Sequence, residues 1–245
     1  MGQMGYGYGS QWHLLRYLGY HRHNLCNHIL NVTGGDTIEW LDFHFSSRNE
    51  SLYNDMERYG LDFIDEKDAQ FKWKQFWPQT GQAHNWDAVG KLSINGSTEW
   101  ILVEAKSNIG ELNSFCKAEK RGREIIELAL RQTQKAFNAE HVPIEQWLGP
   151  YYQYCNRLAM LYFLANVCLP SIPARLVFIY FIGDNTPNAV CPQKEEDWLD
   201  LLATLYEYIK IDLSSVLMSR VHTLCIPVHP NVLGQRKLTP IQKCK

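Results

Sequence analysis

Two strand-like segments joined by Asn95-Gly96 constrain the fold of this chain more than any other feature of its sequence. The first segment, WDAVGKLSI, ends at Ile94, and the second, STEWILVEAK, begins at Ser97. Asn-Gly suits the two-residue turns whose twist matches antiparallel strands, and it is the strongest short hairpin signal. The pattern therefore predicts a β-hairpin in which Ile94 lies opposite Ser97.

The register of this hairpin determines which polar side chains meet at its open end. Counting outward from the turn, Val89 lies opposite Leu102, and Asp87 lies opposite Glu104. Opposed residues of an antiparallel pair have Cβ atoms about 4.5–5.5 Å apart. Lys106 follows Glu104 by two residues and therefore points to the same face. The sequence thus predicts that two carboxylates and one ammonium group lie close together.

Two neighbouring carboxylates repel each other, and the pKa of one of them rises unless a positive charge compensates. That charge can come from Lys106 or from a bound divalent cation. A small set of hard oxygen ligands suits Mg²⁺, which binds one or two carboxylates and keeps waters or phosphate oxygens. We therefore expect either a metal site or an ion pair at Asp87 and Glu104.

The rest of the chain alternates between helical and strand-like segments. The run RLVFIYFI, which ends before Gly183, is continuously apolar and is typical of a strand buried on both faces. Pro227 marks a late strand over 221–228 as an edge strand. The remaining patterns predict helices over 10–30 (ended by Gly34-Gly35), 112–138, 150–169 and 195–211, a strand over 71–77, and a solvated loop or short helix over 46–70. This order predicts an α/β fold with a mixed central β-sheet flanked by helices.

Length and composition limit the class of protein. The 245 residues are interpreted as a single domain, 1–245, with residues 1–9 as a flexible N-terminal lead. A net charge of −2 excludes a polycation wrapped around nucleic acid, so any basic surface must be local. No segment has the roughly 18 apolar residues needed to cross a bilayer, so no membrane partner is expected. Seven scattered cysteines without a Cys-x-x-Cys pair indicate reduced thiols and predict a cytoplasmic location.

The residues at the open end of the hairpin resemble a known motif. Asp87, then the apolar strand 100–103, then Glu104-Ala105-Lys106 resembles the PD-(D/E)XK nuclease superfamily. The core of that superfamily is restriction-endonuclease-like, with element order αβββαβ. Residues 71–183 are expected to form this core, followed by an extra C-terminal helix and strand. The resemblance departs at the proline of the motif, because Trp86 precedes Asp87.

The resemblance implies a Mg²⁺-dependent nuclease that hydrolyses phosphodiester bonds, with DNA as its partner. Asp87 and Glu104 would ligate Mg²⁺ or Mn²⁺, with the Ala105 carbonyl as a further ligand. Lys106 would position or deprotonate the attacking water, and the metal would polarise the scissile phosphate. Two alternatives stay open: a catalytically inactive module of this fold that binds nucleic acid or regulates, and a structural ion pair alone.

Many members of the superfamily take another acid from the first helix, and the predicted helix 10–30 contains none. Glu39 or Asp42 could supply it from the next segment, and Glu111 could serve beside the metal ligands. Each of them could equally be an ordinary surface acid. Without a third acid, one metal ion is expected rather than two.

Basic and polar side chains after the hairpin are candidate substrate contacts. Lys117, Lys120 and Arg121 cluster on the helix that leaves the predicted site. They could contact phosphates or form a solvated helix face. Gln153 and Arg157 share one face of the helix that begins near residue 150, and RecB-like members of the superfamily carry comparable polar residues there. Cleavage of both strands of a duplex would favour a homodimer with two sites.

Two further clusters have simpler explanations. The first predicted helix contains the metal-binding residue types His21, His23, Cys26 and His28. Only His23 and Cys26 share a helical face, so the spacing does not predict a zinc site. The aromatic residues of segment 71–86 could stack on unpaired bases. Aromatic residues at this density are usually core, and we predict core positions for Trp73, Phe76, Trp77 and Trp86.

Overall fold

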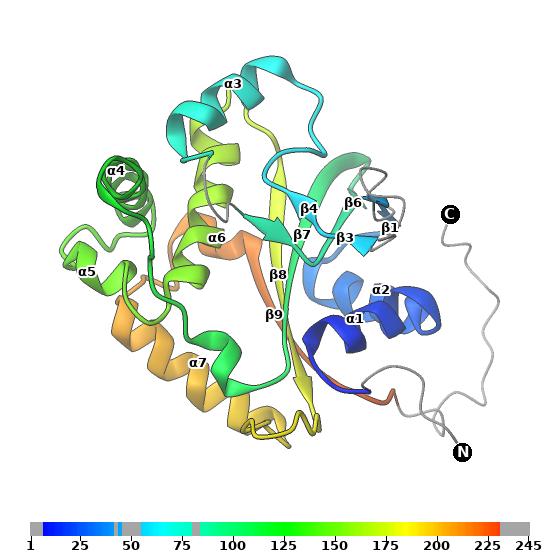
Figure 1. The fold of residues 1–245 in the computed structure, drawn as a ribbon. Helices are drawn as coiled ribbons and strands as arrows, with labels where there is room; N and C mark the ends of the chain where they lie inside the picture. The colour runs from blue at the N-terminus through cyan, green and yellow to red at the C-terminus, as the bar shows by residue number, and fades with distance from the viewer. Residues whose placement is uncertain (1–6, 42–43, 46–54, 80–83, 231–245) are drawn as a thin grey trace.

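A five-stranded sheet forms the centre of the computed structural model, which describes residues 7–41, 44–45, 55–79 and 84–230. β1, β6 and β7 pair antiparallel, whereas β7, β8 and β9 pair in parallel. The sheet is therefore mixed, as predicted, and Pro227 lies in an edge strand. The strands follow one another across the sheet in chain order (Figure 1): β1 (Thr37–Trp40), β6 (Ala88–Ile94), β7 (Ser97–Lys106), β8 (Ala174–Ile182) and β9 (Val221–Pro227).

The hairpin β6–β7 has the predicted register. Ile94 pairs with Ser97, and Val89 pairs with Leu102. The pairing ends with Ala88 opposite Val103, and just beyond it the Asp87 N–H donates to the Val103 carbonyl at 3.2 Å. The local sequence around the turn therefore determines which residues reach the end of β7.

The turn itself requires left-handed backbone at both central positions, with φ of 49° at Asn95 and 76° at Gly96. Gly96→Ala should lower the free energy of unfolding by about 1–2 kcal/mol, because a Cβ is strained in this region. Urea denaturation would measure this loss of stability. Gly19→Ala is the matched control, since an added Cβ there meets nothing within 4 Å. An equal loss of stability in both variants would contradict the assigned turn.

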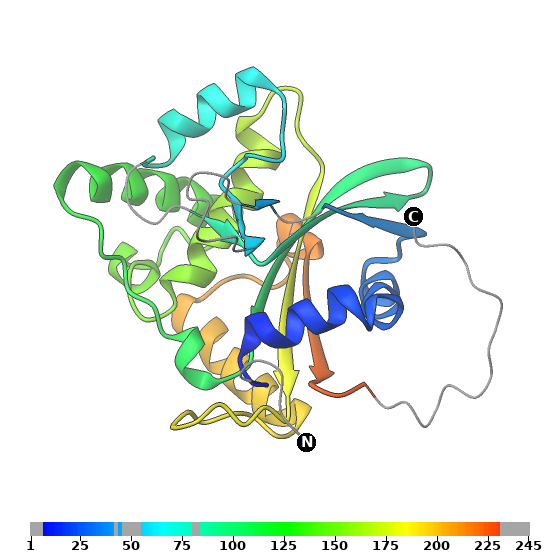
Figure 2. The same ribbon diagram turned by 45° about the vertical axis from the view of Figure 1, so that its right-hand side comes forward.

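Helices cover both faces of the sheet (Figure 2). α1 (Ser10–Gly19) and α2 (Arg22–Thr33) pack on one face over a core that contains Ile179 of β8. The neighbouring residue Phe178 points into the core on the other face, so β8 is buried on both sides, as its apolar sequence predicts. The core on that other face is covered by α3 (Lys67–Phe76), α4 (Lys120–Ala136), α6 (Tyr152–Tyr162) and α7 (Glu195–Ile209).

Shorter elements complete the described chain. β2 pairs with β3 and β4 pairs with β5, both antiparallel. In the described part of the chain, no helix combines the length and the apolar character that a membrane span requires. The short elements are β2 (His44–Phe45), β3 (Asp55–Met56), β4 (Arg58–Tyr59), β5 (Asn85–Trp86), η1 (Ile109–Leu112), α5 (Ile144–Trp147), the π-helical turn η2 (Phe163–Val167) and η3 (Val216–Arg220).

The strand predicted over 71–77 is wrong, because this segment lies largely in helix α3. Ala69 and Trp73 are buried four residues apart on one face of this helix, and Trp77, which is also buried, follows directly after its end. The alternation of aromatic and polar residues in FKWKQFW imitated a strand over a short window. The first strand of the sheet is instead β1, which lies before the predicted core range 71–183.

The helix predicted over 10–30 is two helices. Gly19 has a low helix propensity, and the chain turns after it as Tyr20 and His21 both donate their N–H groups to the Arg16 carbonyl. The second helix runs three residues past the predicted end and stops at Gly34, whose φ of 70° is typical of a helix C-terminus. The Gly34-Gly35 signal is thus confirmed.

The helix predicted over 112–138 begins only at Lys120. Residues 113–119 are extended instead, because backbone hydrogen bonds hold them beside another part of the chain. The N–H of Ser114 donates to the Pro150 carbonyl at 2.8 Å, and that of Cys116 donates to the Leu148 carbonyl at 2.9 Å. This extended segment becomes one side of the candidate site.

The described residues include only parts of the two segments that were predicted to be solvated or flexible. Residues 46–54 lie outside the described residues, but Leu61, Phe63 and Ile64 of the same stretch are buried. That part of the prediction is therefore wrong. Residues 1–6 of the predicted flexible lead also lie outside the described residues. Gly9, at its end, donates its N–H to Asp184 Oδ2 at 3.2 Å.

Asp184 fastens α1 to the loop that follows β8. It is buried, and its Oδ1 lies 2.8 Å from His13 Nε2 on α1. Thr186 donates its hydroxyl to Oδ2 at 2.6 Å. Burial alone would raise the pKa of Asp184, but the hydrogen bonds from His13 and Thr186 lower it to about 2. The start of α1 is thereby held beside the carboxyl ends of the central strands.

Candidate active site

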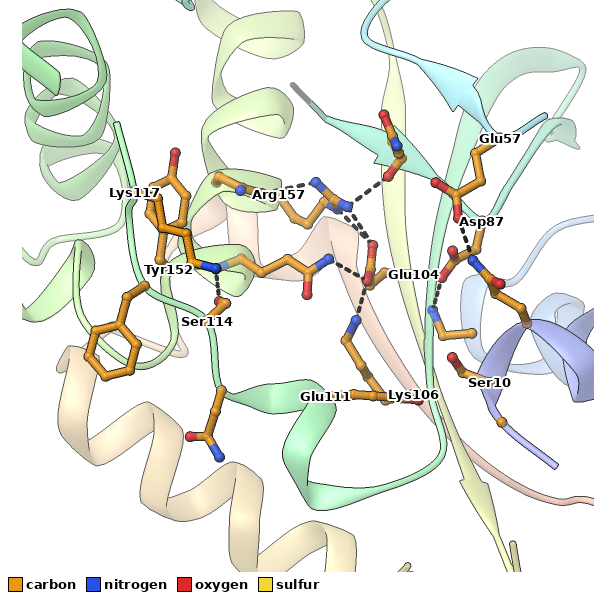
Figure 3. Close-up of a pocket in the computed structure, with 18 of the residues that line it drawn as sticks. Ser10, Glu57, Asp87, Glu104, Lys106, Glu111, Ser114, Lys117, Tyr152 and Arg157 are labelled. Atoms are coloured by element: carbon orange, nitrogen blue, oxygen red, sulfur yellow. Dashed lines mark hydrogen bonds and ion pairs between the residues drawn. The ribbon is translucent and has the colours of Figure 1, made fainter. Parts of the chain in front are cut away.

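Asp87 and Glu104 meet at the open end of the hairpin, as the register predicts (Figure 3). Asp87 Oδ2 accepts the Ala105 N–H at 2.7 Å. The N–H and C=O of one strand residue point to the same side, so the Ala105 carbonyl faces the side on which Asp87 lies. The hairpin therefore places a carboxylate and a backbone carbonyl next to each other.

Glu104 is buried and surrounded by donors. Arg157 Nε donates to its Oε2 at 2.8 Å, and Arg157 Nη2 lies 2.7 Å from the same oxygen in an ion pair. Its Oε1 accepts from Gln153 Nε2 at 2.9 Å and from the ammonium group of Lys106. Both carboxylate oxygens are thus engaged by groups from β7 and α6. A carboxylate buried in this way is compensated by charge and hydrogen bonds together.

The neighbours of Arg157 fix its guanidinium in place. Nη2 donates to the Asn85 carbonyl at 2.7 Å, and the group lies 4.8 Å from the centre of the Trp86 ring. Arg157 and Gln153, which we predicted as substrate contacts, therefore do reach the site. There they bind Glu104 rather than project freely, so their first role in this structure is to hold that carboxylate.

The two carboxyl groups differ in protonation. Burial, and next the charge of Glu104, raise the pKa of Asp87 to about 8, against the opposing effects of Lys106 and the Ala105 N–H. Burial would also raise the pKa of Glu104, but Arg157 and Lys106 outweigh it and lower that pKa. Asp87 therefore holds a proton at neutral pH when no cation is bound, whereas Glu104 is ionised.

The raised pKa of Asp87 predicts a pH-dependent stability difference. Its native pKa of about 8 exceeds the unfolded value, so the native state carries an extra proton between those two values. The contribution of Asp87 to stability in EDTA should then fall as pH rises from about 4 to 8. Asp87→Asn cannot titrate, so its stability relative to wild type should increase over the same range. Urea unfolding at a series of pH values measures the difference, and parallel profiles would contradict it.

An acid that the sequence analysis missed also faces the site. Glu57, between β3 and β4, lines the same cleft as Asp87, and its charge contributes to the raised pKa of that group. Its Oε1 accepts from Gln11 Nε2 of α1 at 2.8 Å. Glu57 lies in an acidic stretch without a distinctive spacing, so no sequence signal singles it out.

The acids predicted to complete the site differ in where they lie relative to the cleft. Glu39 lies on β1 opposite Lys91, exposed and outside the cleft, so the structure does not bring it to Asp87 and Glu104. Asp42 lies outside the described residues. Glu111 does line the cleft. Its carboxylate accepts from the Ser107 N–H at 2.7 Å and from the Asn108 side chain at 2.9 Å, which fixes the turn after β7.

A cleft of about 1320 Å³ contains these groups. Lys117 lines it, whereas Lys120 and Arg121 lie on the first turn of α4, exposed and outside the lining. Figure 3 shows Lys117 and Ser10 on opposite sides of the Asp87–Glu104 pair. Of the predicted core aromatic residues, Trp73, Trp77 and Trp86 are buried, and Phe76 is partly buried against them.

The residues at the end of the hairpin fit a divalent cation. Asp87 has one oxygen beyond that bound by Ala105, Glu57 lines the same cleft, and both side chains offer hard oxygen donors. Burial, and next the charge of Glu104, raise the pKa of Asp87, and a bound cation would favour its ionised form. Among the described residues, no group of three or more His, Cys, Asp or Glu side chains already has a metal-binding arrangement. Glu104 could ligate directly only by exchanging Lys106 or Arg157.

Comparisons of this chain with protein-family models, with curated proteins and with solved structures find no match.

Proposed function

We propose that the protein is a Mg²⁺-dependent nuclease that hydrolyses phosphodiester bonds in DNA. The observation that carries this proposal is the convergence of Asp87, Glu104 and Lys106 on the floor of the cleft. Two carboxylates of different protonation beside one ammonium group suit a site that binds a cation and handles an anionic substrate. Mn²⁺ offers the same ligand chemistry.

The order of elements supports the resemblance to the PD-(D/E)XK superfamily. The αβββαβ core would consist of α2, β1, the hairpin β6–β7, the crossover with α4 and α6, and β8. α7 and β9 would then be the extra C-terminal helix and strand. This assignment moves the start of the core from residue 71 back to α2.

Each residue has a part in the proposed reaction. Asp87 and the Ala105 carbonyl would hold the cation, with Glu57 beside them. Mg²⁺ bound there would polarise the scissile phosphate and stabilise charge on the leaving oxygen. The Lys106 ammonium, directed by Glu104, would hold the attacking water and the phosphate oxygen in line. Arg157 and Gln153 would keep Glu104 oriented.

A second candidate is a module that binds nucleic acid or regulates without cleaving. The observation that favours it is the engagement of both Glu104 oxygens by protein donors, which leaves that carboxylate compensated without a metal. Such a module would bind DNA equally well with and without a divalent cation.

Incubation of the full chain with labelled DNA tests the proposal. Single strands and duplexes are supplied in millimolar Mg²⁺, in Mn²⁺ and in EDTA, and the products are separated by size. Shorter products that appear with metal and disappear in EDTA are the expected result. Intact DNA under every condition would overturn the nuclease proposal, and metal-independent binding without products would favour the second candidate.

A further inference from the structure

The two sides of the cleft differ in charge. One side, here called the basic wall, is the extended segment 113–119, in which Lys117 and Glu119 are the charged residues. Lys120 and Arg121 follow on the first turn of α4, just outside the lining, so basic side chains exceed acidic ones by two over 113–121. The other side, here called the neutral wall, is the segment 8–15 at the start of α1. It has no Asp, Glu, Lys or Arg, and its His13 is buried against Asp184.

Exposed and partly buried residues alternate along the basic wall. Ser114 and Cys116 are held by backbone bonds to residues 150 and 148. Side chains alternate along an extended chain, so the residues between them point outward. Asn113, Phe115, Lys117 and Glu119 are all exposed, and all line the cleft. Phe115 is 60% exposed.

The neutral wall offers an aromatic surface. Trp12 is partly exposed and lines the cleft, and Leu15, on the same helical face three residues later, is 40% exposed. The Asp184 contacts hold this end of α1 rigidly, with Gly9 and His13 on either side of Trp12 bound to one carboxylate. A rigidly held indole in a cleft is a stacking platform for an unpaired base.

We infer that the cleft takes a single strand of nucleic acid, with its phosphates along the basic wall and its bases against Trp12; this inference rests on the proposed nuclease function. A duplex presents phosphates on both sides and keeps its bases paired, so half of its phosphates would face a wall that has no Lys or Arg side chain and has Glu57 beside it. A single strand carries phosphates on one side and base faces on the other. It therefore matches the asymmetry of the cleft.

Binding to a fluorescently labelled single strand, and to the duplex of the same strand, tests the inference. The measurements use Asp87→Asn in EDTA, so that cleavage does not interfere. The single strand should bind more tightly than the duplex. Adding Trp12→Ala should weaken single-strand binding by about fivefold or more, and should leave duplex binding unchanged. Tyr20→Ala is the control, since Tyr20 is 89% exposed on the same chain segment and outside the cleft.

Two further variants separate stacking and charge from a general loss of structure. Trp12→Phe should retain single-strand binding, whereas Trp12→Leu should lose it, because only the aromatic ring stacks. Lys117→Ala should reduce the slope of log affinity against log salt by about 0.7, as expected for one phosphate contact of a single strand. Trp12→Ala should leave that slope unchanged.

The outcomes distinguish this inference from the proposed function. Equal or tighter duplex binding, or a Trp12→Ala variant that binds the single strand as well as its Asp87→Asn parent, would overturn the single-strand inference even if the wild type cleaves DNA. Tight, Trp12-dependent binding of single strands by a protein that never cleaves would overturn the nuclease proposal alone.

Discussion

Asp87→Asn is expected to reduce metal-dependent DNA cleavage by about 10³-fold or more. Polarisation by a bound metal supplies several kcal/mol of transition-state stabilisation, and each 1.4 kcal/mol or so is a factor of ten in rate. Asparagine keeps the size of the side chain but removes the charge that would hold the cation. Initial cleavage rates at saturating Mg²⁺, with labelled DNA in excess, measure the loss.

Glu39→Gln is the matched control for this prediction. It also removes one carboxylate from the sheet, but Glu39 lies on β1 outside the cleft, so cleavage should be unchanged. The cleavage rate of Glu57→Gln should lie between those of Asp87→Asn and Glu39→Gln. A loss of about 10–100-fold is expected, as found for groups that support a metal ligand. Wild-type rates in Asp87→Asn would remove this residue from the mechanism.

Arg157→Ala should lower the free energy of unfolding by about 3–5 kcal/mol, because it leaves the buried Glu104 carboxylate without its main compensating charge. Denaturant unfolding at neutral pH measures the loss. Lys72→Ala is the control, since Lys72 pairs with an Asp68 side chain that is 63% exposed. Its removal should change stability by less than about 1 kcal/mol.

A second substitution separates the effect of charge from that of lost packing. Arg157 also covers the Trp86 ring, so its removal leaves space as well as an unpaired carboxylate. If charge dominates, Glu104→Gln in the Arg157→Ala background should recover part of the lost stability. If the double variant is no more stable than Arg157→Ala, packing rather than charge explains the loss.

The parts of the fold that depend on local sequence were predictable. Asn95-Gly96 determines the turn, the turn determines the register, and the register brings Asp87 to Glu104. The apolar run 175–182 identified β8 for the same kind of reason, because a strand buried on both faces admits few polar residues. The strand prediction for segment 71–77 failed because so short a run of aromatic and polar residues fits both the period of a strand and the period of a helix.

The surroundings of the site could not be predicted, because they come from distant parts of the chain. Glu57 reaches the cleft through a short two-stranded pairing, and Trp12 through the attachment of α1 to Asp184. The segment 113–119 has a composition that a helix tolerates, and only its backbone bonds to residues 148 and 150 make it extended. No spacing in the sequence reports such tertiary contacts.

The parallel pairing of β7 with β8 has a consequence for how activity would appear during folding. The hairpin β6–β7 needs only local contacts, so its carboxylates can come together early. The partners of Glu104 on α6 belong to the long crossover from β7 to β8. Parallel strands joined by such a crossover pair slowly, because the chain loses the entropy of closing the loop before the contacts between the strands form. Glu104 would remain without its arginine until that crossover closes. Recovery of function after dilution from denaturant would therefore trail the recovery of strand signal, and would report the last step of assembly.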